Sequence, residues 1–321
     1  MSAPPAQSVW PVTQQTAHSQ RRGRYLPAST AHPGKMLPEL ARQAIRAYSN
    51  VGELVLDPMC GIGTSLVEAV HFGRRAIGVE LEPRWAAISA ANVCLARDQG
   101  ATGRGLVTRG DARRLGLGLL DQLQGSVQLI LSSPPYGDSL HGHVRKRPDR
   151  VEKYDDRYSH NPDNLAQLPR RQRRRGRPPF TTALGEIIAG CRRLLAPAGF
   201  LVLTARPYRR GGELVDLPGQ LEQLALDAGL ELHDRLVALL CGLRGGELVP
   251  RASFFQLQKQ RSGAIPRMLL IAHEDVLVFR KPPTRLSSRK LKGGQREPKC
   301  SDGSSVSVDA RVRGEARGRA A

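Results

Sequence analysis

Residues 54–70 read LVLDPMCGIGTSLVEAV, and this stretch decides the fold. Its first three residues form an apolar run that predicts a buried strand. The run leads into a Gly-X-Gly loop at Gly61 and Gly63, and residues 65–70 then predict a helix. Because glycine has no Cβ, such a loop can turn tightly and approach a ligand. A strand, a glycine loop and a helix in this order are typical of a cofactor-binding α/β fold.

The loop differs from the dinucleotide fingerprint, because Leu66 occupies the position of its third glycine. This difference argues against a pyrophosphate site and favours a smaller adenosyl ligand. Glu80 ends a predicted strand over 76–80, about 20 residues past the glycines, where an acid typically binds a ribose diol. Asp111 follows a candidate strand over 106–108 and can accept from an adenine amine. Either acid alone could be a solvated loop residue, but their order after predicted strands favours a cofactor site.

A second motif, SSPPY at residues 132–136, directly follows an apolar run over 127–131 that predicts a buried strand. The prolines end this strand because neither has an N–H group to donate. In open α/β sheets, ligands bind at the carboxyl ends of the strands. A planar base could stack on Tyr136 while Ser133 and the Pro134 carbonyl accept from its exocyclic amine. A plain strand-to-loop turn is the alternative interpretation of the motif.

Together these motifs resemble the amino-group DNA methyltransferases, which use S-adenosylmethionine to modify cytosine N4 or adenine N6. The resemblance covers about residues 32–282, and the stretches that carry it are HPGKMLP at 32–38, Asp57 to Thr64, Glu80, Asp111, Ser133 to Tyr136 and HEDVLVFRK at 273–281. Met59 stands where the family usually has Phe. Ser133 in the first position of its motif is more typical of cytosine-N4 enzymes, whereas Asp or Asn is more typical of adenine-N6 enzymes.

The resemblance implies a doubly wound, Rossmann-like α/β methyltransferase sheet of seven strands, mostly parallel with an antiparallel last strand. It also implies S-adenosylmethionine as the cofactor. The residues implied to bind the cofactor are His32, Lys35, Asp57, Pro58, Cys60, Gly61, Gly63, Thr64, Glu80 and Asp111. The residues implied to act on the base amine are Ser133, Pro134, Pro135 and Tyr136.

Apolar patterning predicts the same alternation of elements along the chain. Strands are expected over 54–56, 76–80, 106–108, 127–131, 199–204, 231–240 and 275–279. Helices are expected over 36–48, 65–70, 117–123, 181–195 and 217–228. Strands that alternate with helices predict a doubly wound sheet.

We expect one methyltransferase domain over residues 32–283, flanked by two basic segments. Residues 1–31 are polar without clear periodicity and are expected to form a flexible arm. Residues 284–321 are rich in Ser, Gly and Arg and are expected to be a disordered tail. The segments of about 137–180 and 243–267 are expected to be insertions, because they are too long for ordinary connections.

The chain carries a formal net charge of +20, which indicates a polyanionic partner. A solvated basic surface is the alternative. A dense run of arginines is expected to neutralise phosphates without reading sequence: Arg170, Arg171, Arg173, Arg174, Arg175 and Arg177. DNA is the favoured partner and RNA is possible, since tRNA guanosine-N2 methyltransferases use a similar glycine loop and Pro-Pro-aromatic motif. A basic nucleic-acid-binding protein with a vestigial cofactor fold is the non-enzymatic alternative.

Other features of the sequence argue against several classes of protein. No apolar stretch reaches the roughly 18 residues of a membrane span, and the N-terminal residues lack an apolar signal region. The five cysteines form no CxxC pair, so neither a metal site nor a disulfide framework is expected. A cytoplasmic location without a membrane partner is expected, and the oligomeric state is left open.

Overall fold

The computed structural model describes the folded domain with several gaps. The described residues are 7–115, 118–136, 143–146, 151–154, 159, 161–168, 178–210, 213–250 and 269–283. The predicted tail over 284–321 and the arginine run over 170–177 lie outside these residues.

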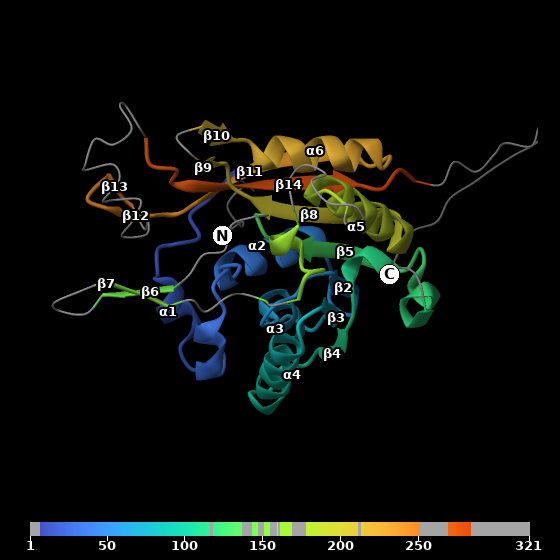
Figure 1. The fold of residues 1–321 in the computed structure, drawn as a ribbon. Helices are drawn as coiled ribbons and strands as arrows, with labels where there is room; N and C mark the ends of the chain where they lie inside the picture. The colour runs from blue at the N-terminus through green and yellow to red at the C-terminus, as the bar shows by residue number, and fades with distance from the viewer. Residues whose placement is uncertain are drawn as a thin grey trace, which may run out of the picture. The chain divides into compact units, whose positions relative to one another are not determined.

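An eight-stranded sheet forms the centre of this domain, in the order β1-β11-β14-β8-β5-β2-β3-β4 (Figure 1). The strands are β1 Val9–Trp10, β2 Leu54–Asp57, β3 Arg75–Glu80, β4 Arg104–Arg109, β5 Val127–Ser132, β8 Leu195–Ala205, β11 Glu231–Leu239 and β14 His273–Arg280. Strand β14 runs antiparallel to β11 and β8, and the other pairs in this sheet are parallel. The predicted fold is therefore confirmed, and β1 is an added edge strand.

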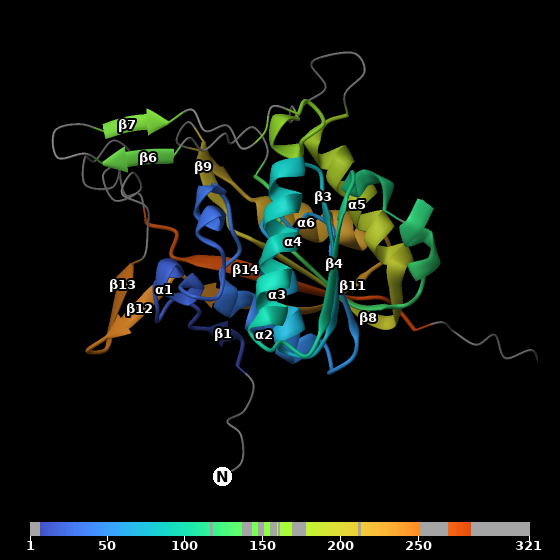
Figure 2. The same cartoon turned by 90° about the horizontal axis from the view of Figure 1, so that it is seen from below.

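Helices cover both faces of this sheet. The α-helices are α1 Ala17–Arg21, α2 Pro38–Tyr48, α3 Thr64–His71, α4 Pro83–Asp98, α5 Phe180–Leu194 and α6 Leu217–Asp227. Helices α2, α3 and α4 lie on one face, and α5 and α6 lie on the other (Figures 1 and 2). The short 3-10 helices are η1 Pro27–Ala31, η2 Ala112–Arg114, η3 Gly118–Leu123 and η4 Leu165–Gln167. The helix expected over 117–123 is thus a 3-10 helix.

Three two-stranded sheets complete the described elements. They are β6 His143–Lys146 with β7 Val151–Tyr154, β9 Tyr208–Arg210 with β10 Glu213–Val215, and β12 Cys241–Arg244 with β13 Glu247–Pro250. The hairpins β6–β7 and β12–β13 fall in or at the start of the two predicted insertions.

The core explains why the central strands are apolar throughout. Successive side chains of a strand point to opposite faces, so Leu129 and Leu131 of β5 pack in the cluster that contains α2 and α3. Ile130, which lies between them, packs in the cluster that contains α5 and α6. Because both faces are covered, these strands lack the polar alternation of a half-exposed sheet.

Residues 7–31 differ from the flexible arm that we expected. Strand β1 pairs in parallel with β11, and Trp10 is 8% exposed. Farther along, the Tyr25 hydroxyl donates to Glu68 of α3 at 2.6 Å, and Arg24 forms an ion pair with the same carboxylate. The segment is held by a few anchors at irregular spacing, which is why its sequence shows no periodic signal.

The carboxyl ends of the parallel strands gather polar residues at one edge of the sheet. Asp57 and Glu80 are the last residues of β2 and β3, Ser133 follows β5, and Arg206 follows β8. Because β14 runs in the opposite direction, its first residues, including Glu274, reach the same edge. The fold therefore brings together groups that are far apart in sequence.

Candidate active site

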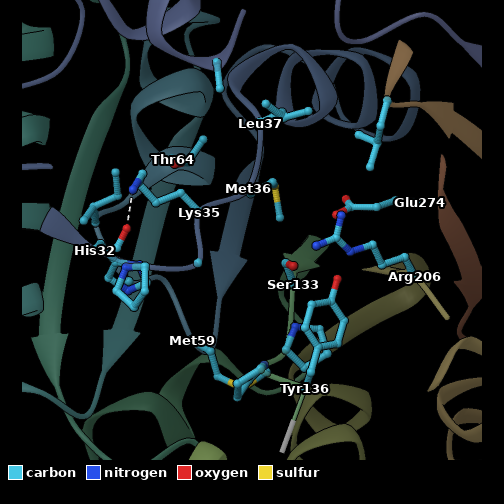
Figure 3. Close-up of a pocket in the computed structure, with 18 of the residues that line it drawn as sticks. His32, Lys35, Met36, Leu37, Met59, Thr64, Ser133, Tyr136, Arg206 and Glu274 are labelled. Atoms are coloured by element: carbon cyan, nitrogen blue, oxygen red, sulfur yellow. Dashed lines mark hydrogen bonds between the residues drawn. The ribbon is translucent and has the colours of Figure 1, made fainter. Parts of the chain in front are cut away.

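A cavity of about 670 Å³ lies at this edge of the sheet (Figure 3). Its size is within the range of about 300–1,000 Å³ of small-molecule sites. The predicted site residues that line it are His32, Lys35, Asp57, Cys60, Gly61, Thr64, Ser133, Pro134, Pro135 and Tyr136. The cavity thus brings together the predicted cofactor loop and the predicted base motif.

A smaller crevice of about 40 Å³ lies beside the cavity, where β3 and β4 end. It is lined by Pro58, Glu80 and Asp111, which are the other predicted cofactor residues apart from Gly63. Met59 and Pro135 line both spaces. The two spaces therefore lie side by side and share a wall formed by Met59 and Pro135.

Asp57 connects the cofactor loop to the strand that leads into the base motif. Its carboxylate accepts from the backbone N–H of Met59 at 3.0 Å and from the hydroxyl of Ser132 at 2.9 Å, and it also accepts from the hydroxyl of Ser65. Burial raises the pKa of Asp57 to about 6, although these hydrogen bonds favour its charged form. The side chain fixes β2, the start of α3 and the end of β5 relative to one another.

The structure requires glycine at both loop positions, Gly61 and Gly63, but for different reasons. Gly63 has φ of 80°, and a Cβ there would overlap the hydroxyl of Ser89 on α4, so the helix fills the space that glycine leaves. Gly61 has φ of 53°, and a Cβ there would lie 3.0 Å from Nε2 of His32, which lines the cavity. Both conformations favour glycine, and only Gly61 borders the ligand space.

Glu80 is buried, and both of its carboxylate oxygens are engaged. They accept from the backbone N–H groups of Gly61 at 2.8 Å and Glu82 at 2.9 Å. Burial raises the pKa of Glu80 to about 7, and the charges of Glu82 and Asp57 act in the same direction. Each carboxylate oxygen has a further lone pair, so Glu80 can still accept from a ligand hydroxyl.

Asp111 lies with Glu80 along the crevice and is paired with Arg113. The guanidinium of Arg113 contacts the carboxylate of Asp111 at 2.6 Å and also lies 3.6 Å from Asp163. Burial opposes ionisation of Asp111, but the hydrogen bonds from Arg113 outweigh it and hold the pKa below its usual range. Asp111 is therefore an acceptor over the whole neutral pH range.

A segment from the first predicted insertion covers this crevice. Asn164 donates to Glu82 at 3.0 Å, and the Ser159 hydroxyl donates to the same carboxylate. Asp163, Asn164 and Leu165 line the crevice. These residues were not predicted as site residues, although the apolar Leu165 within a polar stretch was a signal that the segment packs on the domain.

His32 and Lys35 lie on the side of the cavity opposite Tyr136, in the segment before α2 (Figure 3). The Lys35 ammonium donates to the carbonyls of His32 and Thr30. Burial lowers the pKa of Lys35 to about 8. The His32 ring packs edge-on against Trp85 of α4, with 4.7 Å between ring centroids. These contacts fix the segment that closes this side of the site.

The base motif presents its aromatic ring to the cavity. Tyr136 packs against Tyr208, with ring centroids 5.5 Å apart, and the Tyr208 hydroxyl donates to the Tyr136 carbonyl at 2.9 Å. Burial raises the pKa of the Tyr136 hydroxyl, and the nearby charge of Glu274 raises it further. The ring is therefore a fixed, neutral surface beside Ser133 and Pro134.

Arg206 and Glu274 line the same cavity and were not predicted as site residues. The signals that could have identified them are a charged residue directly after an apolar strand and an acid at the start of the closing strand. The N-terminal residues Thr13, Gln15 and Thr16 also line the cavity. They were not predicted either, because residues 1–31 were expected to form a flexible arm.

Comparison with known proteins supports the resemblance. Residues 2–91 match the DNA methylase family. The tRNA (guanine(10)-N2)-dimethyltransferase of Methanocaldococcus jannaschii is 36% identical over 110 residues, covering 34% of this chain and 30% of the relative. The type II methyltransferase M.MjaII of that organism is 27% identical over 74 residues, covering 23% and 14%. The matches thus span 30% or less of these relatives.

Among solved structures, TrmN from Thermus thermophilus has a TM-score of 0.46 and 19% identity, covering 82% of this chain and 53% of that chain.

The chain has the Rossmann-like fold of S-adenosylmethionine-dependent methyltransferases. Its N-terminal part is similar to the DNA methylase family, so the resemblance predicted from the motifs is confirmed. The family match supports S-adenosylmethionine as the methyl donor. Within the described residues, no helix has the length and apolar character needed to cross a membrane.

Proposed function

We propose that this protein transfers a methyl group from S-adenosylmethionine to the exocyclic amine of a base in nucleic acid, with cytosine N4 in DNA as the favoured target. One observation carries the proposal: a single cavity is lined both by the glycine loop after β2 and by Ser133 to Tyr136 after β5. A cofactor loop and a base-amine motif can support methyl transfer only if the methyl group and the amine are held in the same cavity. A cytoplasmic location is part of this proposal.

The residues of the crevice and cavity offer the polar groups that the cofactor needs. Glu80 offers acceptors for the two ribose hydroxyls, and Asp111 offers an acceptor for the adenine amine. The loop from Asp57 to Thr64, with His32 and Lys35 opposite, encloses the space left for the methionine part. When bound, the cofactor supplies an electrophilic methyl group on its sulfonium.

The base motif increases the nucleophilicity of the amine by positioning it. The lone pair of an exocyclic amine is delocalised into the ring. Ser133 and the Pro134 carbonyl can accept its two N–H groups and thereby direct the lone pair toward the methyl group. Ser133 is a poor general base, so the proton leaves to water. No covalent intermediate is needed, because positioning alone can contribute roughly 7–11 kcal/mol.

The target base must leave the duplex to reach this cavity, at a cost of a few kcal/mol. Stacking on Tyr136 recovers about 1–3 kcal/mol of this cost. The arginines over 170–177 are proposed to hold the phosphates meanwhile. Replacing them with serine should flatten the salt dependence of DNA affinity. The slope of log affinity against log salt concentration should decrease by roughly 0.9 for each phosphate that is no longer neutralised. A change of methylated sequence in that variant would instead place the run in a recognition element.

Transfer to guanine N2 in tRNA is the second candidate, and the 36% identity to a tRNA (guanine(10)-N2)-dimethyltransferase favours it. The experiment is to incubate the protein with heavy-methyl S-adenosylmethionine and either duplex DNA or total tRNA, followed by mass spectrometry of the nucleosides. We expect labelled N4-methylcytosine from DNA. Label in tRNA guanine alone would favour the second candidate, and no label in either would contradict the proposed activity.

The matched variants for this assay are Ser133→Ala and Ser126→Ala. Ser133 lies at the cavity, whereas Ser126 precedes the opposite end of β5 and donates to the Leu123 carbonyl. Only Ser133→Ala should lose turnover. Equal loss in both variants would indicate a general effect on folding and would contradict a specific role for Ser133.

A further inference from the structure

Two charged side chains face the base motif from β8 and β14, the two strands that follow β5 in the sheet. Arg206 follows β8 and Glu274 lies in β14, and both line the cavity with Ser133 and Tyr136. In Figure 3 the guanidinium of Arg206 lies between the Glu274 carboxylate and the Tyr136 hydroxyl, on the side toward Ser133. The Tyr136 hydroxyl, the Arg206 guanidinium and the Glu274 carboxylate therefore follow one another across the cavity.

The two side chains act on each other and on the tyrosine. The Cζ atom of Arg206 lies 6.0 Å from the centroid of the Tyr136 ring. Burial raises the pKa of Glu274, and the charge of Arg206 acts in the opposite direction. A guanidinium is charged at any ordinary pH and can only donate hydrogen bonds, so Arg206 presents fixed donors at this wall.

The bases differ in what they place beside the amine. Next to N4, cytosine has two acceptors, the ring N3 and the carbonyl O2. Next to N6, adenine has one acceptor, N1, followed by a C–H group. Next to N2 on the same Watson–Crick edge, guanine has the donor N1–H, while its acceptor N3 lies on the other side of the amine. A fixed donor on the Watson–Crick side of the amine site therefore suits cytosine best, suits adenine less, and opposes guanine, because two donors cannot pair.

We propose that Arg206 reads the acceptor edge of the flipped base, donating to N3 and O2 of cytosine, and that Glu274 is its positioning residue and counter-charge. This inference rests on the proposed function and deepens it, because it assigns the choice of base to a pair of residues outside the base motif.

The counter-charge has a kinetic role. As the methyl group is transferred, the amine nitrogen becomes positively charged, and an uncompensated guanidinium nearby would oppose this change. In its ionised form, the Glu274 carboxylate would offset the charge of Arg206 and reduce this opposition. Arg206 therefore contributes mainly to binding and base choice, whereas Glu274 contributes mainly to turnover.

The test compares Arg206→Ala, Glu274→Gln and the double variant in steady-state assays with single-stranded DNA, and in binding assays with oligo-dC and oligo-dA of equal length. Arg206→Ala should raise KM roughly 10- to 100-fold, since it removes a bidentate hydrogen bond to the base, and should abolish a preference for oligo-dC. Glu274→Gln should lower kcat about tenfold with little change in KM. The double variant should have a higher kcat than Glu274→Gln alone.

The matched control is Arg235→Gln, which removes a guanidinium paired with Asp275 of β14 at 3.2 Å, next along the strand from Glu274. It should leave both constants unchanged. Melting curves and S-adenosylmethionine affinity of every variant should stay close to those of the wild type.

Four outcomes overturn the inference, and the last of them also refutes the proposed function. Unchanged KM and base preference in Arg206→Ala would exclude its contact with the base. A lower kcat in the double variant than in Glu274→Gln would exclude the counter-charge. A wild-type product methylated at adenine or guanine would refute the choice of cytosine and leave amine methylation intact. A wild type that methylates no nucleic acid would instead refute the proposed function, and this inference with it.

Discussion

Cofactor affinity should depend on pH through Glu80. Burial and the charges of Glu82 and Asp57 raise its pKa to about 7, and a carboxylate must be ionised to accept from both ribose hydroxyls. With a pKa near 7, about 9% of the free protein is ionised at pH 6 and about 91% at pH 8. Because apparent affinity scales with the fraction of protein in which Glu80 is ionised, the dissociation constant for the cofactor should be about tenfold higher at pH 6 than at pH 8.

Titration calorimetry at pH 6, 7 and 8 measures this effect, which corresponds to about 1.4 kcal/mol. Glu80→Gln should weaken binding at pH 8 and abolish most of the pH dependence between pH 6 and pH 7, which lies below the pKa of about 8 of Lys35. Asp111→Asn is the matched control in the same crevice: the pKa of Asp111 is lowered, so this variant should bind more weakly but keep the pH dependence. A wild-type affinity that is constant from pH 6 to pH 8 would refute the reasoning.

The raised pKa of Glu80 also predicts a pH dependence of folding stability. Its sign is opposite to that of cofactor affinity, because stability should fall as the pH rises. The folded-state pKa of Glu80 is raised, so the folded protein binds more protons than the unfolded chain between about pH 4 and pH 7. Its contribution to stability is present below about pH 4 and is lost as the pH rises through 7. In the absence of cofactor, Glu80→Gln should therefore reduce the fall in melting temperature across this range, and an unchanged profile would contradict the assignment.

Three further predictions concern single residues. Glu68→Gln should destabilise the fold by about 1–3 kcal/mol in denaturant melts, because the buried Glu68 carboxylate accepts from Arg24, Arg42 and Tyr25; a loss under about 1 kcal/mol would show that the N-terminal segment is held otherwise. Gly63→Ala should cost at least about 1–2 kcal/mol from its positive φ alone, with more from overlap with Ser89, and a neutral melt would exclude this strain. Tyr136→Ala should spare cofactor affinity in calorimetry but weaken DNA binding by about 1–3 kcal/mol; the reverse pattern would place the ring on the cofactor.

The sequence predicts β2, β3 and β5 and the order of their motifs because these strands are largely apolar runs that end in a polar residue. Burial on both faces makes such runs distinct, and the polar ends mark the edge where ligands bind. Asp57, Glu80 and Ser133 are identified in this way. Their hydrogen-bond partners are not, because an acid that binds backbone N–H groups, as Glu80 does, has the same sequence pattern as one that is free.

The N-terminal segment could not be predicted for a topological reason, whereas Arg206 and Glu274 were missed because their positions beside strands carry no chemical motif. Residues 7–31 join the domain through the pairing of β1 with β11, which is far away in sequence. Glu274 is at the ligand edge only because β14 is antiparallel. Such placements depend on strand direction and order, which local patterning does not specify.

The physical link between the cofactor loop and the base motif favours catalysis by positioning. Strands β2 and β5 are neighbours in the sheet, and Asp57 at the end of β2 binds both the hydroxyl of Ser132 and the hydroxyl of Ser65. The loop that would hold the methyl donor and the motif that would hold the amine are therefore fixed to one buried carboxylate. Misplacement by about 1 Å can cost about a hundredfold in rate, so Asp57 can govern turnover without contacting the base.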